Sequence, residues 1–184
     1  MTETLILIVP VILGATGVWL YNRLVTDRNL VEAGWADIDV QLKRRHDLIP
    51  RLVSCVKAYA DFERATLEAV AELRQQSEEA RDLMSKASIE DAIESGLHKV
   101  IVTVEDYPEL KADNNFRELQ AELIETENRI QYARRFYNGA VRNLNTRIES
   151  FPTLLIADPL GFKEAQFFAV HADAERQAPT VELR

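Results

Sequence analysis

Apolar residues recur at helical spacing through much of the first half of this chain. Between Tyr21 and Arg74 they follow one another in alternating steps of three and four, which places them on one face of a helix. The stripe consists of Val31, Trp35, Ile38, Leu42, Ile49, Leu52, Val56, Tyr59, Val70 and Leu73. Arg45 and Glu63 stand where the pattern calls for an apolar side chain. The spacing therefore predicts a long helix whose single buried stripe carries two charges.

The composition agrees with a helical domain. A chain of 184 residues suits one modest domain plus an appendage. Six Gly, six Pro and 28% charged residues favour an all-α fold over a sandwich or barrel. The net charge of −8 argues against nucleic acid as a partner, because phosphate binding needs a dense Lys/Arg face. The single Cys55 excludes an intramolecular disulfide and a multi-Cys zinc site, and we expect it to be a buried, inert thiol.

The segment from Leu5 to Tyr21 contains no charged residue. About 17 residues give roughly 25 Å of helix, slightly less than a hydrocarbon core of about 30 Å. Trp19 and Tyr21 are residue types that favour the membrane interface and can make up the difference. A cleaved signal peptide would need a basic start, but only Glu3 precedes the apolar run. We therefore expect an uncleaved span of the lipid bilayer.

Basic residues follow this span and none precedes it. They are Arg23, Arg28, Lys43, Arg44 and Arg45. The positive-inside rule then places the amino terminus outside and the body in the cytoplasm. The expected domains are an anchor over residues 1–21 and a helical bundle over residues 22–184, with a short tail.

Pro50 interrupts the first long helix. It removes the amide that would bond the carbonyl of His46, and its ring crowds that carbonyl. It either kinks the helix or ends it, and the strong periodicity on both sides favours a kink. Next to it, Arg44 and His46 are expected to be solvated, whereas Arg45 is expected to pair with a carboxylate from another helix.

The segment over residues 75–87 is polar and suits a helix end beyond the packed region, so we expect it to be solvated. Ser88 with Asp91 three residues later predicts the start of a new helix. Its apolar stripe consists of Ile89, Ile93, Leu97, Val100, Ile101 and Val104. Tyr107-Pro108 should end that helix, because the residue before proline avoids the α region.

A second long helix should begin at Asp113 or Asn114. Its apolar residues recur every seven positions: Phe116, Leu123, Ile130, Tyr137, Leu144 and Phe151. This spacing predicts packing along a nearly parallel or antiparallel partner, as in coiled-coil-like bundles. Phe151-Pro152 should close the helix. Beyond it we expect a turn at Pro159-Leu160-Gly161-Phe162 and a short helix in EAQFFAVHADAE, residues 164–175, with Phe162, Phe167 and Phe168 docking on the bundle.

Polar residues also lie on the stripe of this second helix. Glu127 and Arg134 each follow a heptad residue by four positions, so they repeat the pattern of Arg45 and Glu63. One acid and one base on each buried stripe predict ion pairs between the two helices, which fix register more than they add stability. Asn138 and Asn145 are one heptad apart, and we expect them to set register or to hydrogen-bond between helices.

Several long motifs resemble the LemA family of bacterial membrane-anchored proteins. They are YNRLV from Tyr21, RRHDLIPRLV from Arg44, YPEL from Tyr107, DNNFRELQAELIETENRIQYARRFYNGAV from Asp113 and NTRIESFP from Asn145. The resemblance covers nearly the whole chain. It implies one amino-terminal membrane helix, a small external amino terminus and a cytoplasmic antiparallel helical bundle. Leu144 departs from the family, which usually has an aromatic residue there. The resemblance implies an architecture rather than an activity.

No motif for catalysis or cofactor binding occurs, such as a P-loop, GxGxxG, GxSxG or HExxH. The nearest approach to a metal site is Glu94 with His98, one pair where a di-iron bundle needs several. We therefore predict no catalytic residue, no metal and no cofactor, and a protein that is not an enzyme.

Three functions remain, in order of preference. The first is a membrane-surface scaffold formed by self-association, for which surplus apolar residues would be Ala58, Leu67, Ala69 and Leu83. The second is an adaptor for another membrane protein, a protease or sensor of envelope stress. Its interaction surface would contain Tyr107, Pro108, Glu109 or Phe162. The third is a ligand-binding bundle that uses the polar residues of the stripes.

Overall fold

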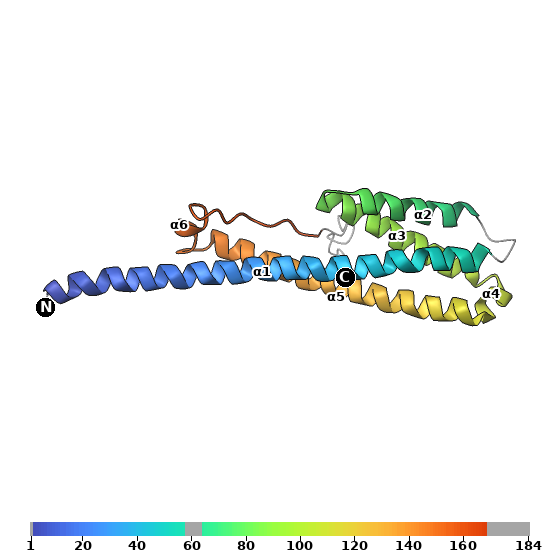
Figure 1. Ribbon diagram of the computed structural model, residues 1–184, viewed down its shortest axis with the longest axis horizontal. Helices are drawn as coiled ribbons and strands as arrows, with labels where there is room; N and C mark the ends of the chain where they lie inside the picture. The colour runs from blue at the N-terminus through green and yellow to red at the C-terminus, as the bar shows by residue number, and fades with distance from the viewer. Residues whose placement is uncertain (1, 58–63, 169–184) are drawn as a thin grey trace, which may run out of the picture. The chain divides into compact units, whose positions relative to one another are not determined.

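The computed structural model describes the backbone of residues 2–57 and 64–168, and the side chains of residues 11–57 and 64–168. All regular secondary structure in these ranges is helical, as predicted. The helices are α1 (Thr2–Lys57), α2 (Arg64–Glu79), α3 (Leu83–Val104), α4 (Pro108–Ala112), α5 (Asn114–Glu149) and α6 (Leu154–Ala157) (Figure 1). The chain divides into two compact units. Unit 1 comprises Met1–Val40 and Ile130–Phe167, and unit 2 comprises Gln41–Arg129 and Phe168–Arg184.

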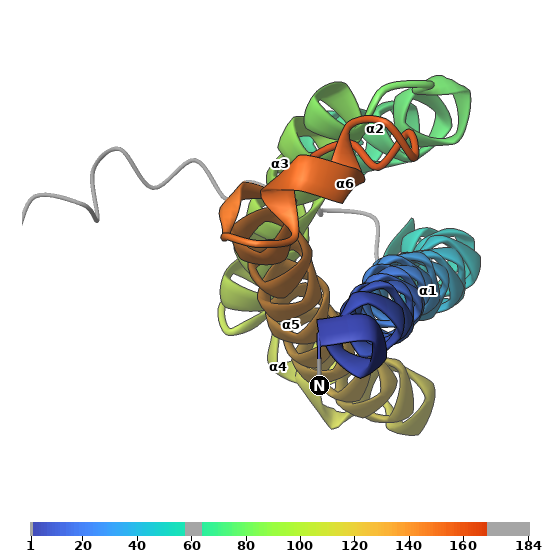
Figure 2. The same ribbon diagram turned by 90° about the vertical axis from the view of Figure 1, so that its left-hand side faces the viewer.

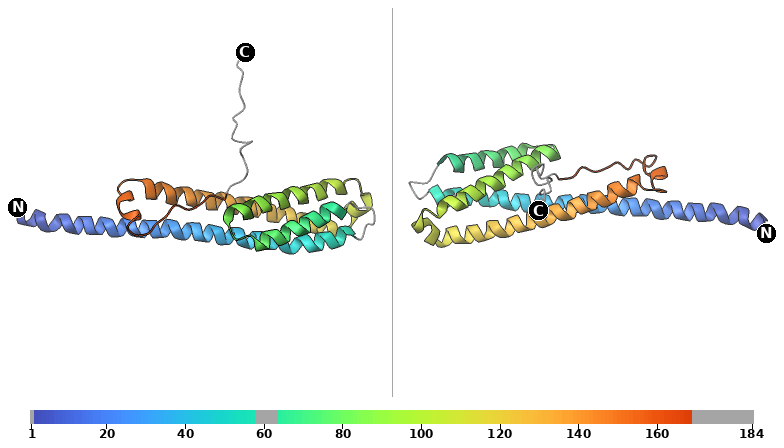
Figure 3. Two further views of the ribbon diagram at one scale, coloured as in Figure 1. Left: turned by 90° about the horizontal axis from the view of Figure 1, so that it is seen from above. Right: turned by 180° about the vertical axis from the view of Figure 1, so that it is seen from behind.

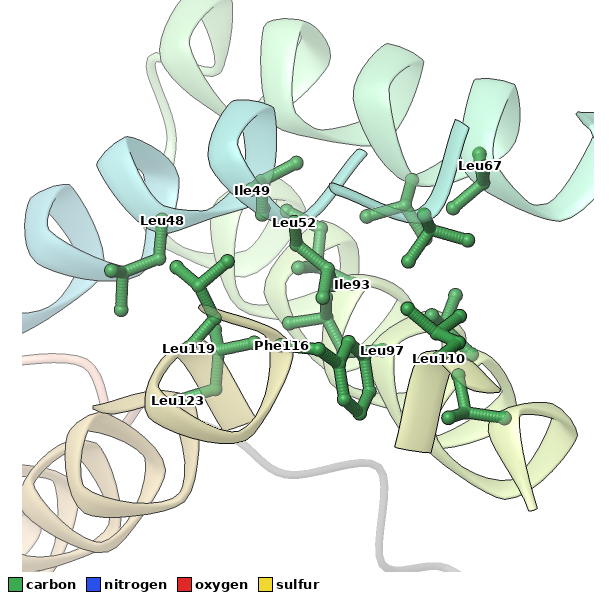
Figure 4. Packing of buried hydrophobic residues seen from close by; sticks show 14 residues of the cluster. Leu48, Ile49, Leu52, Leu67, Ile93, Leu97, Leu110, Phe116, Leu119 and Leu123 are labelled. Atoms are coloured by element: carbon green, nitrogen blue, oxygen red, sulfur yellow. The ribbon is translucent and has the colours of Figure 1, made fainter. Parts of the chain in front are cut away.

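Unit 2 is a helical bundle around an apolar core. The last turns of α1, then α2, α3 and the first turns of α5, run in alternating directions (Figure 3). Figure 4 shows how side chains from these helices converge, with Leu52 of α1 above Ile93 of α3 and close to Phe116 of α5. The buried cluster consists of Leu48, Ile49, Leu52, Val56, Leu67, Val70, Ile93, Leu97, Val100, Val104, Leu110, Phe116, Leu119 and Leu123. Leu67, expected to be surplus surface, is 1% exposed in this core.

The prediction of one helix as far as Arg74 is wrong. Helix α1 ends at Lys57, and α2 begins at Arg64 and runs in the opposite direction (Figure 1). Two successive helices that bury the same kind of stripe keep similar three-and-four spacing, so periodicity reveals a face but not a reversal of direction. The stripe residues Tyr59 and Glu63 lie outside the described residues.

Helix α1 continues through Pro50 without a break, so the alternative of two helices at this point is excluded. The start of α3 differs from the prediction. Asp82 is its N-cap and accepts a hydrogen bond from the Ser85 amide at 2.8 Å, whereas Ser88 lies inside the helix. Asp113 caps α5 as predicted, since its carboxylate accepts from the Phe116 amide at 2.9 Å.

Unit 1 pairs the first part of α1 with the second part of α5 (Figure 2). The Trp35 and Tyr137 rings meet edge to face with their centroids 6.0 Å apart, and Arg147 donates a hydrogen bond to Asp27. Residue numbers rise along one helix as they fall along the other, so the pair is antiparallel. Gly34 permits this close approach, because a Cβ there would lie 3.1 Å from the backbone of Tyr137.

The end of α5 differs from the heptad prediction. The helix stops at Glu149, and Phe151 is 80% exposed rather than buried, because a stripe describes a face only while the helix continues. Phe162 and Phe168 are buried as predicted, but Phe167 is 44% exposed. The described part of the expected tail helix, residues 164–168, forms no regular structure, and its remaining residues 169–175 lie outside the described residues.

No helix in the described part of the chain is long and apolar enough to cross a membrane. The side chains of the first ten residues lie outside that part, and Leu5–Pro10 of the predicted span are among them.

Candidate functional site

Unit 2 contains a carboxylate that is buried inside the helical bundle. Glu90 of α3 is fully buried. It lies on the apolar face of its helix, three residues before Ile93 and seven before Leu97, so packing of that face carries the carboxylate inward. Buried carboxylates need partners that compensate for the loss of water. Three other helices supply them: Arg45 and His46 from α1, Ser77 from α2 and, through Arg45, Glu127 from α5.

Arg45 joins two acids. Its Nη2 donates to the Glu90 carboxylate and, at 3.1 Å, to the backbone carbonyl of the same residue. Its Nη1 donates to Oε2 of Glu127 at 2.8 Å. The arginine is 1% exposed, whereas the Glu127 side chain is 26% exposed. A planar guanidinium with several fixed donors suits this bridging position better than an ammonium would.

The second oxygen of Glu90 is satisfied by α1 and α2. Nε2 of His46 lies 2.8 Å from Oε1 of Glu90, and the Ser77 hydroxyl donates to the same oxygen. Because that oxygen belongs to an ionised carboxylate, the histidine tautomer that fits carries its proton on Nε2. The Nδ1 atom of His46 faces Glu78 of α2 at 3.9 Å.

The environment of Glu90 sets its ionisation. Burial raises its pKa, but the hydrogen bond from His46, the charge of Arg45 and the hydroxyl of Ser77 outweigh burial and lower the pKa from 4.5 to about 2. Glu90 is therefore ionised at neutral pH. The cluster of Arg45, Glu90 and Glu127 carries one positive and two negative charges.

This chemistry suits structure rather than catalysis. A carboxylate with a pKa near 2 is a weak base at neutral pH, and both of its oxygens already accept hydrogen bonds. Among the residues that the structure describes, no group of three or more His, Cys, Asp and Glu side chains could hold a metal ion. The geometry instead links four helices through one buried carboxylate and its guanidinium partner, an arrangement that specifies which helix faces meet.

The sequence located part of this network. It placed Arg45 on a buried stripe opposite a carboxylate of the second long helix, and Arg45 does contact Glu127. The solvated positions expected for His46 and for the polar segment that contains Ser77 are wrong, since these residues are 6% and 0% exposed. Glu90 was missed, although its place one heptad before Leu97 on an apolar stripe was a readable signal.

The remaining stripe charges lie elsewhere. Arg134 belongs to unit 1 and is 3% exposed, so its predicted burial is correct. The acid expected to complete a second pair, Glu63, lies outside the described residues.

The two stripe asparagines, Asn138 and Asn145, lie in unit 1. The Asn145 amide donates to the carbonyl of Ala165 and accepts from its N–H, both at 2.9 Å. The Tyr137 hydroxyl donates to the carbonyl of Gln166 at 2.8 Å, and burial raises the pKa of that phenol. Asn145 thus holds the extended segment beyond α6, rather than another helix, while Asn138 is half-buried.

The expected interaction surface is only partly exposed. Pro108 and Glu109 are exposed in the first turn of α4, and Tyr107 is half-buried against the core of unit 2. Phe162 does not belong to an accessible surface, because it is 6% exposed.

An open groove of about 820 Å³ on unit 2 lies between α1 and α5, next to Cys55. Burial, and then the charge of Asp113, raise the pKa of the Cys55 thiol. The thiol is half-buried rather than fully buried. A raised pKa makes it a weak nucleophile at neutral pH, which agrees with the inert thiol predicted.

The sequence model of the LemA family matches residues 34–183. The chain belongs to the LemA family. This LemA-family chain is 26% identical over 164 residues to Protein LemA of Metamycoplasma hominis, covering 89% of this chain and 75% of that protein. It is 24% identical over 180 residues to Magnetosome protein MamQ 1 and to Magnetosome protein MamQ 2 of Paramagnetospirillum magneticum, covering 84% of this chain. The chain spans 66% of the length of each of these two relatives.

Proposed function

We propose that this LemA-family chain is a non-enzymatic, single-pass protein of the bacterial inner membrane whose helical bundle self-associates into a scaffold at the membrane surface. The anchor is residues 1–21, and the bundle is residues 22–184 on the cytoplasmic side. The observation that carries the proposal is the stretch of α1 over residues 11–19, which is apolar in sequence and mostly exposed in the described part of the chain.

The exposure of this segment supports an anchor. The described side chains Val11, Ile12 and Leu13 are 71%, 58% and 67% exposed, and Val18 and Trp19 are each 62% exposed. Soluble domains rarely leave a continuous apolar helix uncovered. A lipid environment would cover this segment on all sides. In addition, the helix satisfies its own backbone hydrogen bonds, as lipid requires.

The anchor is tested by extraction and by labelling. The full-length protein expressed in bacteria should stay in the membrane fraction through a carbonate wash, and a variant with Leu13→Arg and Val18→Arg should be released. A matched variant with arginine at two exposed polar positions of α1, Asp37→Arg and Asp39→Arg, should stay bound. A full-length protein that washes off would refute the anchor.

The orientation is tested separately. A cysteine placed at Thr4 in a Cys55→Ser background should react with a membrane-impermeant maleimide added to intact spheroplasts. A cysteine at Arg142, an exposed position of α5, should react only after the membrane is opened. The reverse result would place the bundle on the outer side.

Exposed aromatic residues on α5 support self-association. Tyr132 and Phe136 of unit 1 are one helical turn apart, and they are 73% and 49% exposed. Residues four apart lie on the same helix face, so the two rings form one apolar surface that the described residues leave largely exposed. The surplus residues expected from the sequence contribute less, because Leu67 is buried and Leu83 is half-buried. Ala69 is exposed, and Ala58 lies outside the described residues.

The mass of the full-length protein in mild detergent tests the scaffold. Discrete assemblies should appear, and a variant with Tyr132→Ser and Phe136→Ser should shift toward the monomer. Arg142→Ser, a substitution at an exposed position of the same helix, should leave the mass unchanged. Persistence of the assemblies without residues 1–21 would place the contacts in the bundle. A strict monomer at all concentrations would refute self-association.

The alternative is an adaptor for another membrane protein, a protease or sensor in the envelope-stress response. It is favoured by the exposed Pro108 and Glu109 at the start of α4, a short polar element at one end of unit 2. Crosslinking in cells from a photoreactive residue at Glu109 distinguishes the two. Adducts with a different membrane protein support the adaptor, and adducts with the same chain support the scaffold.

A further inference from the structure

The segment after α5 exposes large apolar side chains in close succession. Phe151 is 80% exposed, Leu154 52%, Leu155 65% and Leu160 51%. Together with α6, which they flank or belong to, they form what we call the α6 segment, residues 151–160. Scattered exposed apolar residues are ordinary on a protein surface, but four large ones within ten residues mark a contact surface.

The exposure follows from a defined backbone conformation. Gly161 has a φ of +75°, and its amide bonds the carbonyl of Asp158 at 3.0 Å. The amide of Phe162 reaches back to the carbonyl of Ala157, also at 3.0 Å. These two bonds with a left-handed glycine constitute a Schellman motif, which ends a helix and reverses the chain. The motif turns Phe162 inward and leaves the leucines of the α6 segment facing outward.

Phe162 fixes where this segment lies within unit 1. Its ring meets the ring of Tyr21 edge to face, with their centroids 5.9 Å apart, and the guanidinium of Arg28 lies 5.5 Å from the centroid of the Phe162 ring. Tyr21 is the last residue of the proposed anchor. The chain beyond α6 therefore passes beside α1 at the point where the anchor ends (Figure 3).

We propose that the α6 segment is a second membrane contact, which inserts Phe151, Leu154, Leu155 and Leu160 into the interfacial region of the bilayer that holds the anchor. The proposal rests on the anchor proposed above, since the anchor brings a lipid surface to this side of unit 1. Apolar side chains at a membrane surface enter the boundary between headgroups and acyl chains. We expect the segment to contact lipid rather than protein. Phe162, which follows the segment, contacts Tyr21, and Tyr21 is the residue at which the proposed anchor leaves the bilayer.

Charges around the segment limit its depth. Asp158 and Pro159 are exposed between Leu155 and Leu160, and a carboxylate does not enter the hydrocarbon core without a large cost. Arg28 and Lys163 are exposed on the same unit, where cations favour anionic headgroups. The segment should therefore lie at headgroup depth, shallower than the anchor.

Fluorescence quenching of a probe on the full-length protein tests this placement. Single cysteines at Leu155, Val18 or Arg142, in a Cys55→Ser background, are labelled with an environment-sensitive dye. The protein is then reconstituted in vesicles of phosphatidylcholine and phosphatidylglycerol. Each probe is titrated with aqueous iodide and with lipids that carry a nitroxide at a shallow or a deep position. All three positions are exposed, so labelling leaves the core intact.

Arg142 is the matched control, because it is an exposed residue of the same unit that lies about 10 Å along α5 from the end of the helix and outside the proposed self-association surface. We expect iodide to quench the Leu155 probe severalfold less than the Arg142 probe. Shallow nitroxides should quench the Leu155 probe most, and the Val18 probe should respond most to deeper ones.

The other outcomes each overturn the inference in a distinct way. If Val18 is quenched by lipid nitroxides and Leu155 by iodide, the anchor stands and the second contact is absent. If Leu155 is shielded from iodide and from both nitroxides, a second copy of the chain or another segment covers it instead of lipid. If iodide quenches Val18, the anchor fails and the inference fails with it.

Discussion

Replacing Glu90 by glutamine should cost stability in a way that depends on pH. The substitution keeps the shape of the side chain but removes its charge. One of its two oxygens becomes an NH₂ group, which cannot accept a hydrogen bond. If this group replaces Oε1, the bonds from His46 and Ser77 are lost, and if it replaces Oε2, the bond from Arg45 is lost. The buried guanidinium keeps only the half-exposed acid on α5 as a charged partner.

The size of the effect follows from the pKa of Glu90. It is about 2 in the folded protein and 4.5 ordinarily, which corresponds to ~3 kcal/mol of stability at neutral pH. Because the folded pKa is the lower one, this contribution is fully present above pH 4.5 and is lost as the pH falls through about 2. At pH 3 the unfolded chain has bound the proton while the folded chain has largely not, so about 2 of the ~3 kcal/mol are lost.

Denaturant unfolding of the full-length protein in mild detergent, followed by circular dichroism at pH 7 and pH 3, measures the free energy of unfolding at each pH. At pH 7 Glu90→Gln should unfold with ~3 kcal/mol less free energy than the unsubstituted chain, and at pH 3 the difference should shrink to ~1 kcal/mol. Glu127→Gln is the control, since it removes the other partner of Arg45 at a position with 26% of its side chain exposed. It should lose less stability at pH 7 and keep the acid dependence of the unsubstituted chain. A Glu90→Gln penalty that is equal at both pH values would refute the account of the network.

Three further substitutions test the packing, each by thermal or denaturant unfolding. Gly161→Ala should cost ~1 kcal/mol, because the residue has positive φ, whereas the same change at Gly139, inside α5 with open space around it, should be neutral or stabilise by up to ~1 kcal/mol. Gly96→Ala should cost ~1–3 kcal/mol, because its Cβ would lie 2.6 Å from the stiff side chain of Val70, and Val70→Ala should restore part of the loss. Tyr137→Phe should cost ~1 kcal/mol by leaving a backbone carbonyl without its 2.8 Å hydrogen bond, and an unchanged midpoint would count against that bond.

Local patterns predicted the helices that bury a regular stripe. The heptad residues from Phe116 to Leu144 are all buried along α5, and Asp113 caps that helix. The stripe of α3 from Ile93 to Val104 is also correct. These features depend on residues close in sequence, and spacing records them directly.

The spacing of apolar residues does not predict features that depend on which helices pack against each other. The reversal between α1 and α2 leaves the spacing of apolar residues nearly unchanged, so this spacing predicts a single helix. His46 and Ser77 are polar residues beside a stripe, and they are buried only because Glu90 of a third helix accepts their hydrogen bonds. Phe151 has the right spacing to be buried, but α5 stops two residues before it.

The buried network bears on how this protein can bind others. An apolar stripe tolerates a shift of one helix along its neighbour, but such a shift of α3 would carry Glu90 away from Arg45 and leave two buried charges uncompensated. The network thus selects one pairing of the helices within unit 2. Its polar groups bond one another inside the bundle. Specific contacts with another molecule must then come from residues outside it. On unit 1 these include the aromatic pair Tyr132 and Phe136, and in the α6 segment the exposed leucines. Substituting Tyr132 or the exposed leucines should therefore change assembly or membrane contact with little change in stability, whereas substituting Glu90 should change stability first.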